Sequence, residues 1–166
     1  MTLIDIIAAV ILFFSFIGGL TQGAIKTFFS LLGLIIAIPA AGRFYPFFAD
    51  LLSFINPSNW RNFIAFFVTL ALAGIVLSFI LYFPRKITEE SWDDGVLFHL
   101  VGGFLNLLGA AFGILVLALV LSAYPVWDWL QQAFANSLII QWLVNNLSFV
   151  QSLLPEMLRS PLPRAY

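Results

Sequence analysis

The chain has 166 residues, a formal net charge of −1, and 9% charged against 62% apolar residues. About a quarter of the residues of a soluble domain are charged, because its surface must face water. The polar residues here are too few to cover a globule, so we expect lipid to surround most of the fold. Seven scattered basic residues form no basic face, which argues against nucleic acid as a partner. The chain has no cysteine, which excludes disulfides and thiolate chemistry.

Apolar stretches long enough to cross a bilayer, about 20 residues at a rise of about 1.5 Å each, recur along the chain. The first runs from Leu3 to about Leu20. No basic segment precedes it and no small-residue cleavage site follows, so we interpret it as a retained span and not as a signal peptide. Thr21-Gln22-Gly23 then predicts a tight hairpin into the next span.

The second span is expected to begin near Ala24 or Thr27 and to end near Gly42. It is short, and Pro39 is expected to kink or stop it, because proline removes a helical hydrogen bond. The segment from Arg43 to Asn62, with two prolines and two charges inside it, is interpreted as a surface connector.

The third span is the most uniformly apolar and runs from Phe63 to Phe83. Its end is set by Pro84, since the residue before a proline disfavours helical geometry. The following connector, from Pro84 to Gly95, carries six charges and is expected to lie in water.

The fourth span runs from about Leu97 to Tyr124, directly before Pro125. Aromatic residues with a polar edge prefer the membrane–water interface, and they fall near the ends of the expected spans. These residues are Tyr45, Trp60, Tyr82, Trp92, Tyr124, Trp127 and Trp129. The positive-inside rule favours the first and third connectors on the cytoplasmic side by three basic residues to two.

The segment after Pro125 has a different pattern, in which polar and apolar residues alternate at helical spacing. This predicts an amphipathic helix, with a candidate break at Asn136-Ser137, that lies at the membrane interface or packs on the bundle. A fifth span from about Leu138 to Leu154 is the rival, but it would bury amides in lipid. The polar positions are Gln141, Asn145, Ser148 and Ser152, and the apolar positions are Ile140, Leu143, Leu147, Val150 and Leu154.

The predicted fold is therefore all-α: four transmembrane helices over residues 1–124, then an amphipathic helix and tail over 125–166. The last residues, from Ser160 to Tyr166, are expected to fray.

Small residues repeat every four positions on three of the spans, which lets helix backbones approach closely in lipid. Two interpretations follow: the stripes pack the bundle internally, or they form a docking groove for another subunit. The stripes are Ser15, Gly19 and Gly23; Gly33, Ala37 and Ala41; and Gly102, Asn106 and Ala110, with Gly109 and Gly113 alongside.

Three polar side chains within or near the spans are candidates for function. Asp5 either caps the first helix or takes part in a proton relay, and the lack of a second carboxylate within any span favours the cap. Asn106 either bridges helices through its amide or lines a polar path, and its apolar neighbours favour the bridge.

His99 is the single histidine, and Asp93 and Asp94 precede it closely. A pH sensor or a metal site is conceivable for such a group, but a metal needs three or four convergent ligands. The acids are more simply explained as caps at the start of the fourth span, so we expect no metal and no cofactor.

The sequence contains none of the common catalytic fingerprints: no Gly-x-Ser-x-Gly elbow, phosphate loop, His-Glu-x-x-His or dinucleotide motif. The spans also hold few polar groups with which to line a water-filled pore. We therefore expect a protein that is not an enzyme.

Several short motifs between Leu3 and Tyr124 resemble, in their order and spacing, those of the colicin V production protein family. The chain departs from the family pattern in four places. Gln22 stands where the family usually has a basic residue, and Phe98-His99 stands where it usually has an Asp-Arg pair. Gly109 stands in place of an arginine, and Asn106 stands in place of a glycine. The motifs are Asp5-Ile6-Ile7, Gly19-Leu20-Thr21-Gln22-Gly23, Ser30-Leu31-Leu32-Gly33, Phe44-Tyr45-Pro46, Arg61-Asn62-Phe63-Ile64-Ala65-Phe66 and Gly102-x-x-x-Asn106-x-x-x-Ala110.

The resemblance implies a small multi-pass protein of the bacterial inner membrane, associated with colicin V production or export and with envelope stress. Related membrane domains are fused to extracytoplasmic proteases, which implies an anchoring role. The leading hypothesis is support of export or envelope maintenance by docking other membrane or secretion proteins, or a second copy of the chain. The alternatives are a small transporter or channel for an amphipathic solute and, more remotely, an intramembrane hydrolase.

Overall fold

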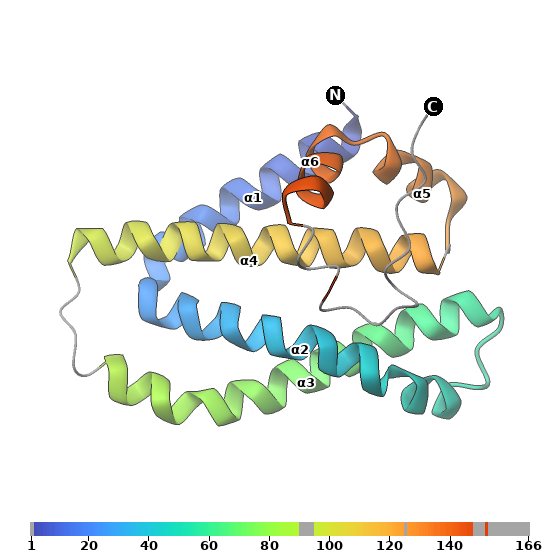
Figure 1. Ribbon diagram of the computed structural model, residues 1–166, viewed down its shortest axis with the longest axis horizontal. Helices are drawn as coiled ribbons and strands as arrows, with labels where there is room; N and C mark the ends of the chain where they lie inside the picture. The colour runs from blue at the N-terminus through green and yellow to red at the C-terminus, as the bar shows by residue number, and fades with distance from the viewer. Residues whose placement is uncertain (1, 90–94, 125, 148–151, 153–166) are drawn as a thin grey trace.

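The computed structural model describes residues 2–89, 95–124, 126–147 and 152, and all regular structure in them is helical (Figure 1). Within this part of the chain, α1 to α4 are each long and apolar enough to cross a membrane. The prediction of an all-α protein with four spans and a helical C-terminal segment is thus confirmed. The helices are α1 (Leu3–Gln22), α2 (Ala24–Leu51), α3 (Ser58–Glu89), α4 (Val96–Ala123), α5 (Asp128–Ala135) and α6 (Leu138–Asn146).

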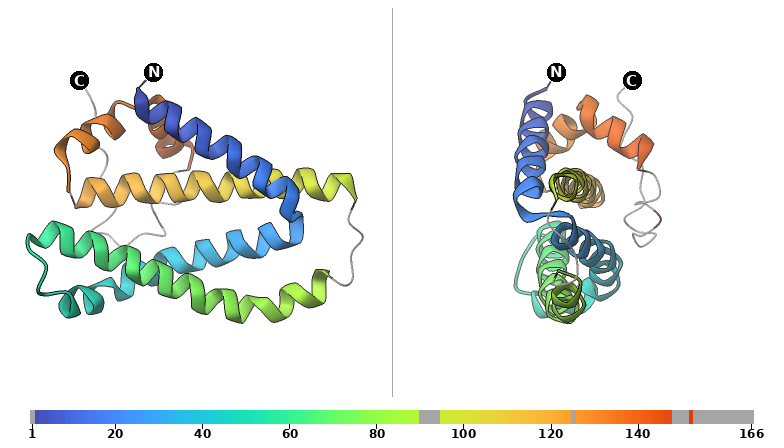
Figure 2. Two further views of the ribbon diagram at one scale, coloured as in Figure 1. Left: turned by 180° about the vertical axis from the view of Figure 1, so that it is seen from behind. Right: turned by 90° about the vertical axis from the view of Figure 1, so that its left-hand side faces the viewer.

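The helix α4 lies in the middle of the molecule. On one side it contacts α1, and α5 and α6 cover the same side (Figure 2). On the other side it contacts α2, which in turn packs along α3. Accordingly, half of the most apolar stretch of α4 is buried, a larger share than in any other long helix described.

Successive long helices run in opposite directions, so their connections alternate between the two ends of the bundle (Figure 1). The α1–α2 turn lies at the end where α3 finishes and α4 begins. Its Gly23 has φ of 78°, a left-handed geometry that glycine adopts without steric cost. The N-terminus, the turn between α2 and α3, and α5 lie toward the opposite end.

The helix α2 is longer than expected. The predicted end near Gly42 is wrong: the helix continues through Pro39 and Pro46 to Leu51, so most of the expected surface connector is helical. The physical reason is tertiary packing, since Tyr45 and Ala49 in this last part are buried. Transmembrane helices tolerate proline where neighbouring elements support the interrupted turn.

The predicted end of α3 is also too early. The helix does not stop at Phe83 but includes Pro84 and continues to Glu89, so the start of the charged connector is helical too. Proline removes one helical hydrogen bond and crowds the preceding turn, which can bend a helix without ending it, and the exposed position of Pro84 leaves room for such a bend. Thr88 Oγ1 donates to Pro84 O at 2.8 Å within this last turn.

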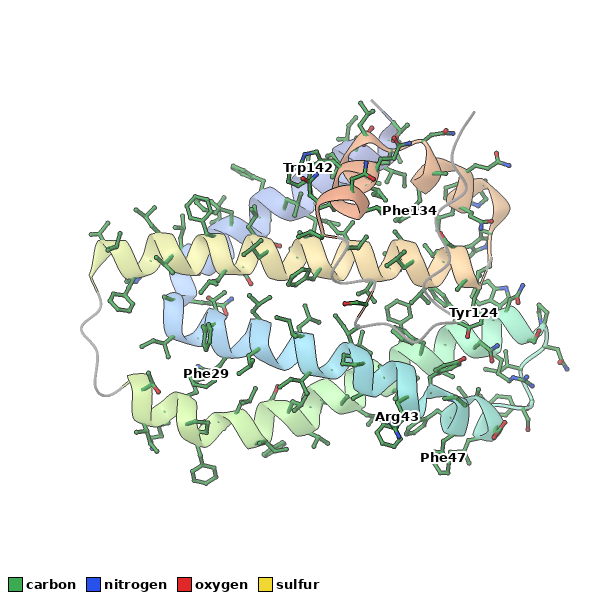
Figure 3. The ribbon with its side chains drawn as sticks, in the orientation of Figure 1. Phe29, Arg43, Phe47, Tyr124, Phe134 and Trp142 are labelled. Atoms are coloured by element: carbon green, nitrogen blue, oxygen red, sulfur yellow. The ribbon has the colours of Figure 1, made fainter. Side chains whose placement is uncertain are left out.

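Two tyrosines expected at the membrane interface are instead buried in the bundle. Tyr124 Oη donates to Tyr45 Oη at 2.7 Å, and Figure 3 shows Tyr124 between the end of α4 and the α2–α3 pair. Phe66 packs against the Tyr45 ring in the same core.

The C-terminal segment is broken at Asn136-Ser137, the candidate break, into α5 and α6. With nine residues, or about 14 Å, α6 is too short to cross a membrane. Its apolar Ile140 and Leu143 are buried, whereas Gln141 is exposed, as the amphipathic pattern requires. Several expectations lie outside the described residues: the caps Asp93 and Asp94, the interfacial Trp92, the stripe positions Ser148, Val150 and Leu154, and the tail from Ser160 to Tyr166.

Candidate functional site

The helices α1 and α4 contact each other closely through two glycines. A Cβ added to Gly19 would lie 2.6 Å from Asn106 Cβ and 2.8 Å from the Gly102 carbonyl carbon. A Cβ added to Gly102 would lie 2.6 Å from both Gly19 O and the carbonyl carbon of Gly23. Real Cβ atoms do not approach backbone so closely, so this contact requires glycine on both helices.

The other small residues of the three stripes are divided between interior and surface. Ala37 and Ala41 of α2 are buried, and a Cβ at Gly33 would meet Leu81 of α3 at an ordinary 3.4 Å. In contrast, Gly113 is exposed, and no atom lies within 4 Å of where its Cβ would be. Ser15, Gly23, Gly109 and Ala110 are partly buried along the contacts of α1, α2 and α4.

Asn106 lies beside the glycine contact. Its Nδ2 donates to the backbone Ser15 O of α1 at 2.5 Å, which is the interhelical bridge favoured from the sequence. The same residue also borders a pocket between α2, α3 and α4.

Asp5 lies at the centre of a buried cluster that joins the first and last helices. Its side chain is 2% exposed, and one oxygen, Oδ2, accepts from Thr2 N at 2.7 Å and from Thr2 Oγ1 at 3.0 Å. The other, Oδ1, accepts from Ser137 Oγ at 2.6 Å and from Ile139 N at 3.1 Å. The capping expected from the sequence is present, since Thr2 and Asp5 form a capping box at the start of α1.

The second half of this cluster is not predicted by the sequence. Ser137 is fully buried and is the N-cap of α6, where its Oγ accepts from Ile140 N at 3.3 Å. A serine before a helical apolar pattern is a strong N-cap signal, so the cap could be found from sequence. Its pairing with Asp5, 132 positions away, could not. One carboxylate thus serves the N-termini of two helices, where negative charge is favourable.

His99 lies in the first turn of α4, far from this cluster along the helix. Its Nδ1 is 3.2 Å from Gly95 O in the preceding turn. Among the described residues, no three His, Cys, Asp or Glu side chains come together as a metal site would require.

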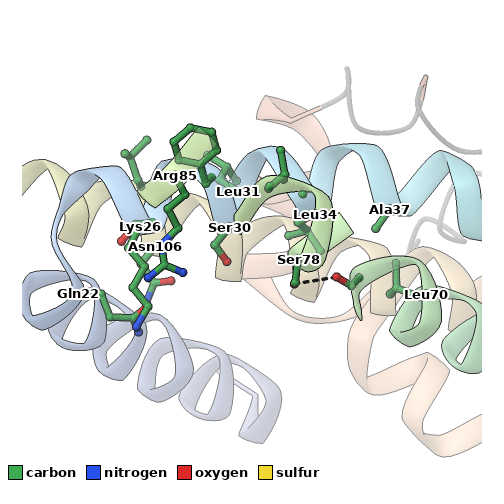
Figure 4. A pocket seen from close by; sticks show the side chains of 17 residues that line it. Gln22, Lys26, Ser30, Leu31, Leu34, Ala37, Leu70, Ser78, Arg85 and Asn106 are labelled. Carbon is green, nitrogen blue, oxygen red and sulfur yellow. Dashed lines mark hydrogen bonds between the residues drawn. The ribbon is translucent and has the colours of Figure 1, made fainter. Parts of the chain in front are cut away.

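A pocket of about 390 Å³ opens between α2, α3 and α4 and reaches the end of α1 (Figure 4). Its polar side chains gather near the end of the bundle that holds the α1–α2 turn, and leucines and small residues line the part toward the middle. Sequence reasoning missed this site, because its two cations, Lys26 and Arg85, lie 59 positions apart and no local pattern brings them together. The polar members are Gln22, Lys26, Ser30, Ser78, Arg85 and Asn106.

Comparison with known proteins gives one family. The family model described as "Colicin V production protein" matches residues 4–148 of the chain, a stretch that extends from α1 through α6. No curated protein and no solved structure matches the chain.

Proposed function

Since the chain belongs to the colicin V production protein family, we propose that it is a non-enzymatic protein of the bacterial inner membrane that supports toxin production and export, or envelope maintenance, by docking partner proteins. The docking surface in this proposal is the outer face of α5 and α6, called the tail platform. The single observation that carries it is the buried Asp5 carboxylate, which fixes the tail platform to the bundle.

A buried carboxylate is an expensive way to hold two short helices. Removing such a charge from water costs several kcal/mol, which only a complete set of hydrogen bonds offsets. An apolar contact would hold α6 at a lower cost, so the use of Asp5 favours a role that demands a defined position of the tail platform. Further polar contacts support this, since Gln141 Nε2 donates to Ala135 O at 2.6 Å and so joins α6 to α5.

The outer face of the tail platform carries large exposed side chains. Trp129 of α5 and Leu138 and Trp142 of α6 are each more than 60% exposed. Tryptophan is enriched both at membrane interfaces and at the centres of protein interfaces, where its area supplies much of the binding energy. Trp127, at the start of α5, packs edge-to-face on Trp60 of α3, with the ring centroids 4.9 Å apart. This contact joins the tail platform to α3.

The test places a photo-crosslinking residue at Trp142 in a colicin V-producing strain that lacks its own family member. A discrete protein adduct is expected at this position. The matched control is Phe79, on the lipid-exposed face of α3, where no such adduct is expected. In this strain, colicin V release must require expression of the protein, so that the amount of released toxin measures its function.

The Asp5→Asn variant connects the adduct to function. An amide in place of the carboxylate turns a donor toward Thr2 or toward Ser137, so the tail platform should loosen. We expect the adduct at position 142 and colicin V release to fall together at unchanged protein level. Full toxin release with the adduct lost would refute the docking proposal.

The pocket favours a second candidate, the transport of an amphipathic solute, because it combines polar and apolar linings. Beyond its apolar part, however, Tyr45, Phe66 and Tyr124 fill the core between α2, α3 and α4. Reconstituted protein that moves a solute across liposomes, with the movement lost in Asn106→Leu, would establish transport in place of docking.

A further inference from the structure

We propose that the pocket between α2, α3 and α4 binds one anionic phospholipid of the surrounding leaflet, with the headgroup phosphate at Lys26 and Arg85 and one acyl chain along the leucines of α2 and α3. This inference does not depend on the tail platform. It rests on the charge, the length and the apolar inner part of the pocket.

The charge of the pocket is concentrated at its outer end. Lys26 from the first turn of α2 and Arg85 from the last turns of α3 both border it, and Figure 4 shows them beside Gln22 and Asn106. None of the described residues that line the pocket is acidic. Two cations with amide donors fit a phosphate group, and basic pockets between membrane helices bind anionic headgroups.

The length of the pocket corresponds to one leaflet. Along α2 the lining runs from Lys26 to Ala37, eleven positions, and along α3 from Arg85 to Leu70, fifteen positions. At about 1.5 Å per residue these are about 16 Å and 22 Å. Half of a bilayer measures about 15 Å for the hydrocarbon and about 21 Å with the headgroup region.

The inner part of the pocket is suited to a chain and not to a second polar group. Leu34, Ala37 and Leu70 line it, and Gly74 leaves room on α3 because nothing lies within 4 Å of where its Cβ would be. The one nearby hydroxyl, Ser78 Oγ, donates to Gly74 O at 2.7 Å and so is already engaged. A volume of about 390 Å³ falls in the usual range for a small-molecule site, roughly 300–1,000 Å³.

The first experiment uses the unmodified full chain purified in a neutral detergent. Native mass spectrometry counts the lipids that stay bound after addition of phosphatidylglycerol or phosphatidylcholine with identical acyl chains. Each basic residue near an anionic surface contributes about fivefold, so two predict a preference of roughly 25-fold for phosphatidylglycerol. Equal retention of the two lipids would overturn the proposal.

Charge variants locate the headgroup. Lys26→Gln and Arg85→Gln should each lower the preference about fivefold, and together about 25-fold. The matched control is Lys86→Gln, which removes the same charge one residue away on α3 but outside the pocket. If the control lowers the preference as much as the pocket variants, the effect is general surface charge and the site is refuted.

Space-filling variants locate the acyl chain. Gly74→Leu should fill the inner pocket and reduce bound phosphatidylglycerol to background, while Gly113→Leu, at an equally open position on α4 outside the pocket, should leave it unchanged. Thermal unfolding followed by circular dichroism checks that both variants fold. If Gly74→Leu does not fold, the charge variants and the lipid preference still test the proposal.

Competition distinguishes the sources of the anion. Glycerol phosphate, which has no acyl chain, should displace no lipid, and oleate should compete at least about tenfold more weakly than phosphatidylglycerol, because it carries no phosphate to bind the two cations. Displacement by glycerol phosphate would make this a site for free phosphate compounds, and equal competition by oleate would make it a fatty-acid site. Either result overturns the phospholipid assignment.

Discussion

Asp5 is held by four donors, two from its own helix terminus and two from the start of α6. Because the group is buried, loss of one side of this cluster leaves the other with unsatisfied polar atoms. The energetic role of Asp5 is therefore shared with Ser137, and the two residues are expected to act as one unit.

A double-mutant cycle tests this coupling. Ser137→Ala should lower the free energy of unfolding in detergent by about 1.5–3 kcal/mol, because it removes a hydrogen bond to a charged group. Added to Asp5→Ala, it should cost much less, giving a coupling energy of about 0.5–3 kcal/mol. Ser122→Ala is the control, since the Ser122 hydroxyl bonds only within α4, to Ala118 O. Additive effects of Asp5→Ala and Ser137→Ala would contradict the shared role.

Asn106 makes a simpler prediction. Asn106→Leu removes the donor to Ser15 O and should lower stability in detergent by about 0.6–2 kcal/mol, the usual range for interhelical hydrogen bonds in membranes. Asn146→Leu removes an amide whose bond stays inside α6, to Trp142 O, and should change stability by less than about 0.5 kcal/mol. The comparison fails if both variants lose the same amount.

At the residue scale, sequence reasoning is most reliable where the partner is near in the chain. The Thr2–Asp5 cap depends on a spacing of three residues and can be read directly. The sequence predicts that Asn106 bridges two helices. It does not predict the acceptor, because a backbone carbonyl on another helix leaves no pattern in the sequence. Ser137 and the pocket cations depend on how distant helices pack, which no local pattern contains.

At the scale of elements, the α1–α4 pair depends on the absence of two Cβ atoms. Gly102→Ala places a methyl group against the backbone of α1 and should force the helices apart, with a loss of about 1–3 kcal/mol. At Gly113 the space is open, so Gly113→Ala should instead stabilise α4 by up to about 1 kcal/mol through higher helix propensity. Thermal unfolding of the two variants in one detergent measures both. A gain in stability from Gly102→Ala would rule out the close contact.

Packing between helices also explains why some helix ends differ from their predicted positions. Hydropathy locates α1 and α4 to within two residues, since their ends coincide with a change from apolar to polar sequence. In α2 and α3 the predicted ends depend on prolines, whose local effect is smaller than the packing of the later turns. The buried Tyr45 and Ala49 hold the last turns of α2 in place despite Pro39 and Pro46.

At the scale of the whole molecule, the alternation of four spans follows from composition alone. Backbone polar groups in lipid must be satisfied within each helix, so apolar stretches of this length become helices and their connections alternate between the two membrane faces. The pairing order is different: α4 contacts both α1 and α2, and its close contact with α1 depends on Gly19 and Gly102. Composition does not encode this order.

The alternation gives a topology that cysteine labelling can measure, because the chain has no cysteine of its own. Single cysteines at Gln22 and Ser91 should react with an impermeant thiol reagent from one side, and those at Ser58 and Ser152 from the other. Gln22 ends α1 and Ser58 begins α3, at opposite ends of the bundle, so the intervening α2 must carry the chain across (Figure 1). Lys26, Arg85 and Lys86 lie at the Gln22 end, so the positive-inside rule places Gln22 and Ser91 in the cytoplasm, where intact cells protect them. Labelling of Gln22 and Ser58 from the same side would show that α2 does not cross, and the four-span bundle would have to be abandoned.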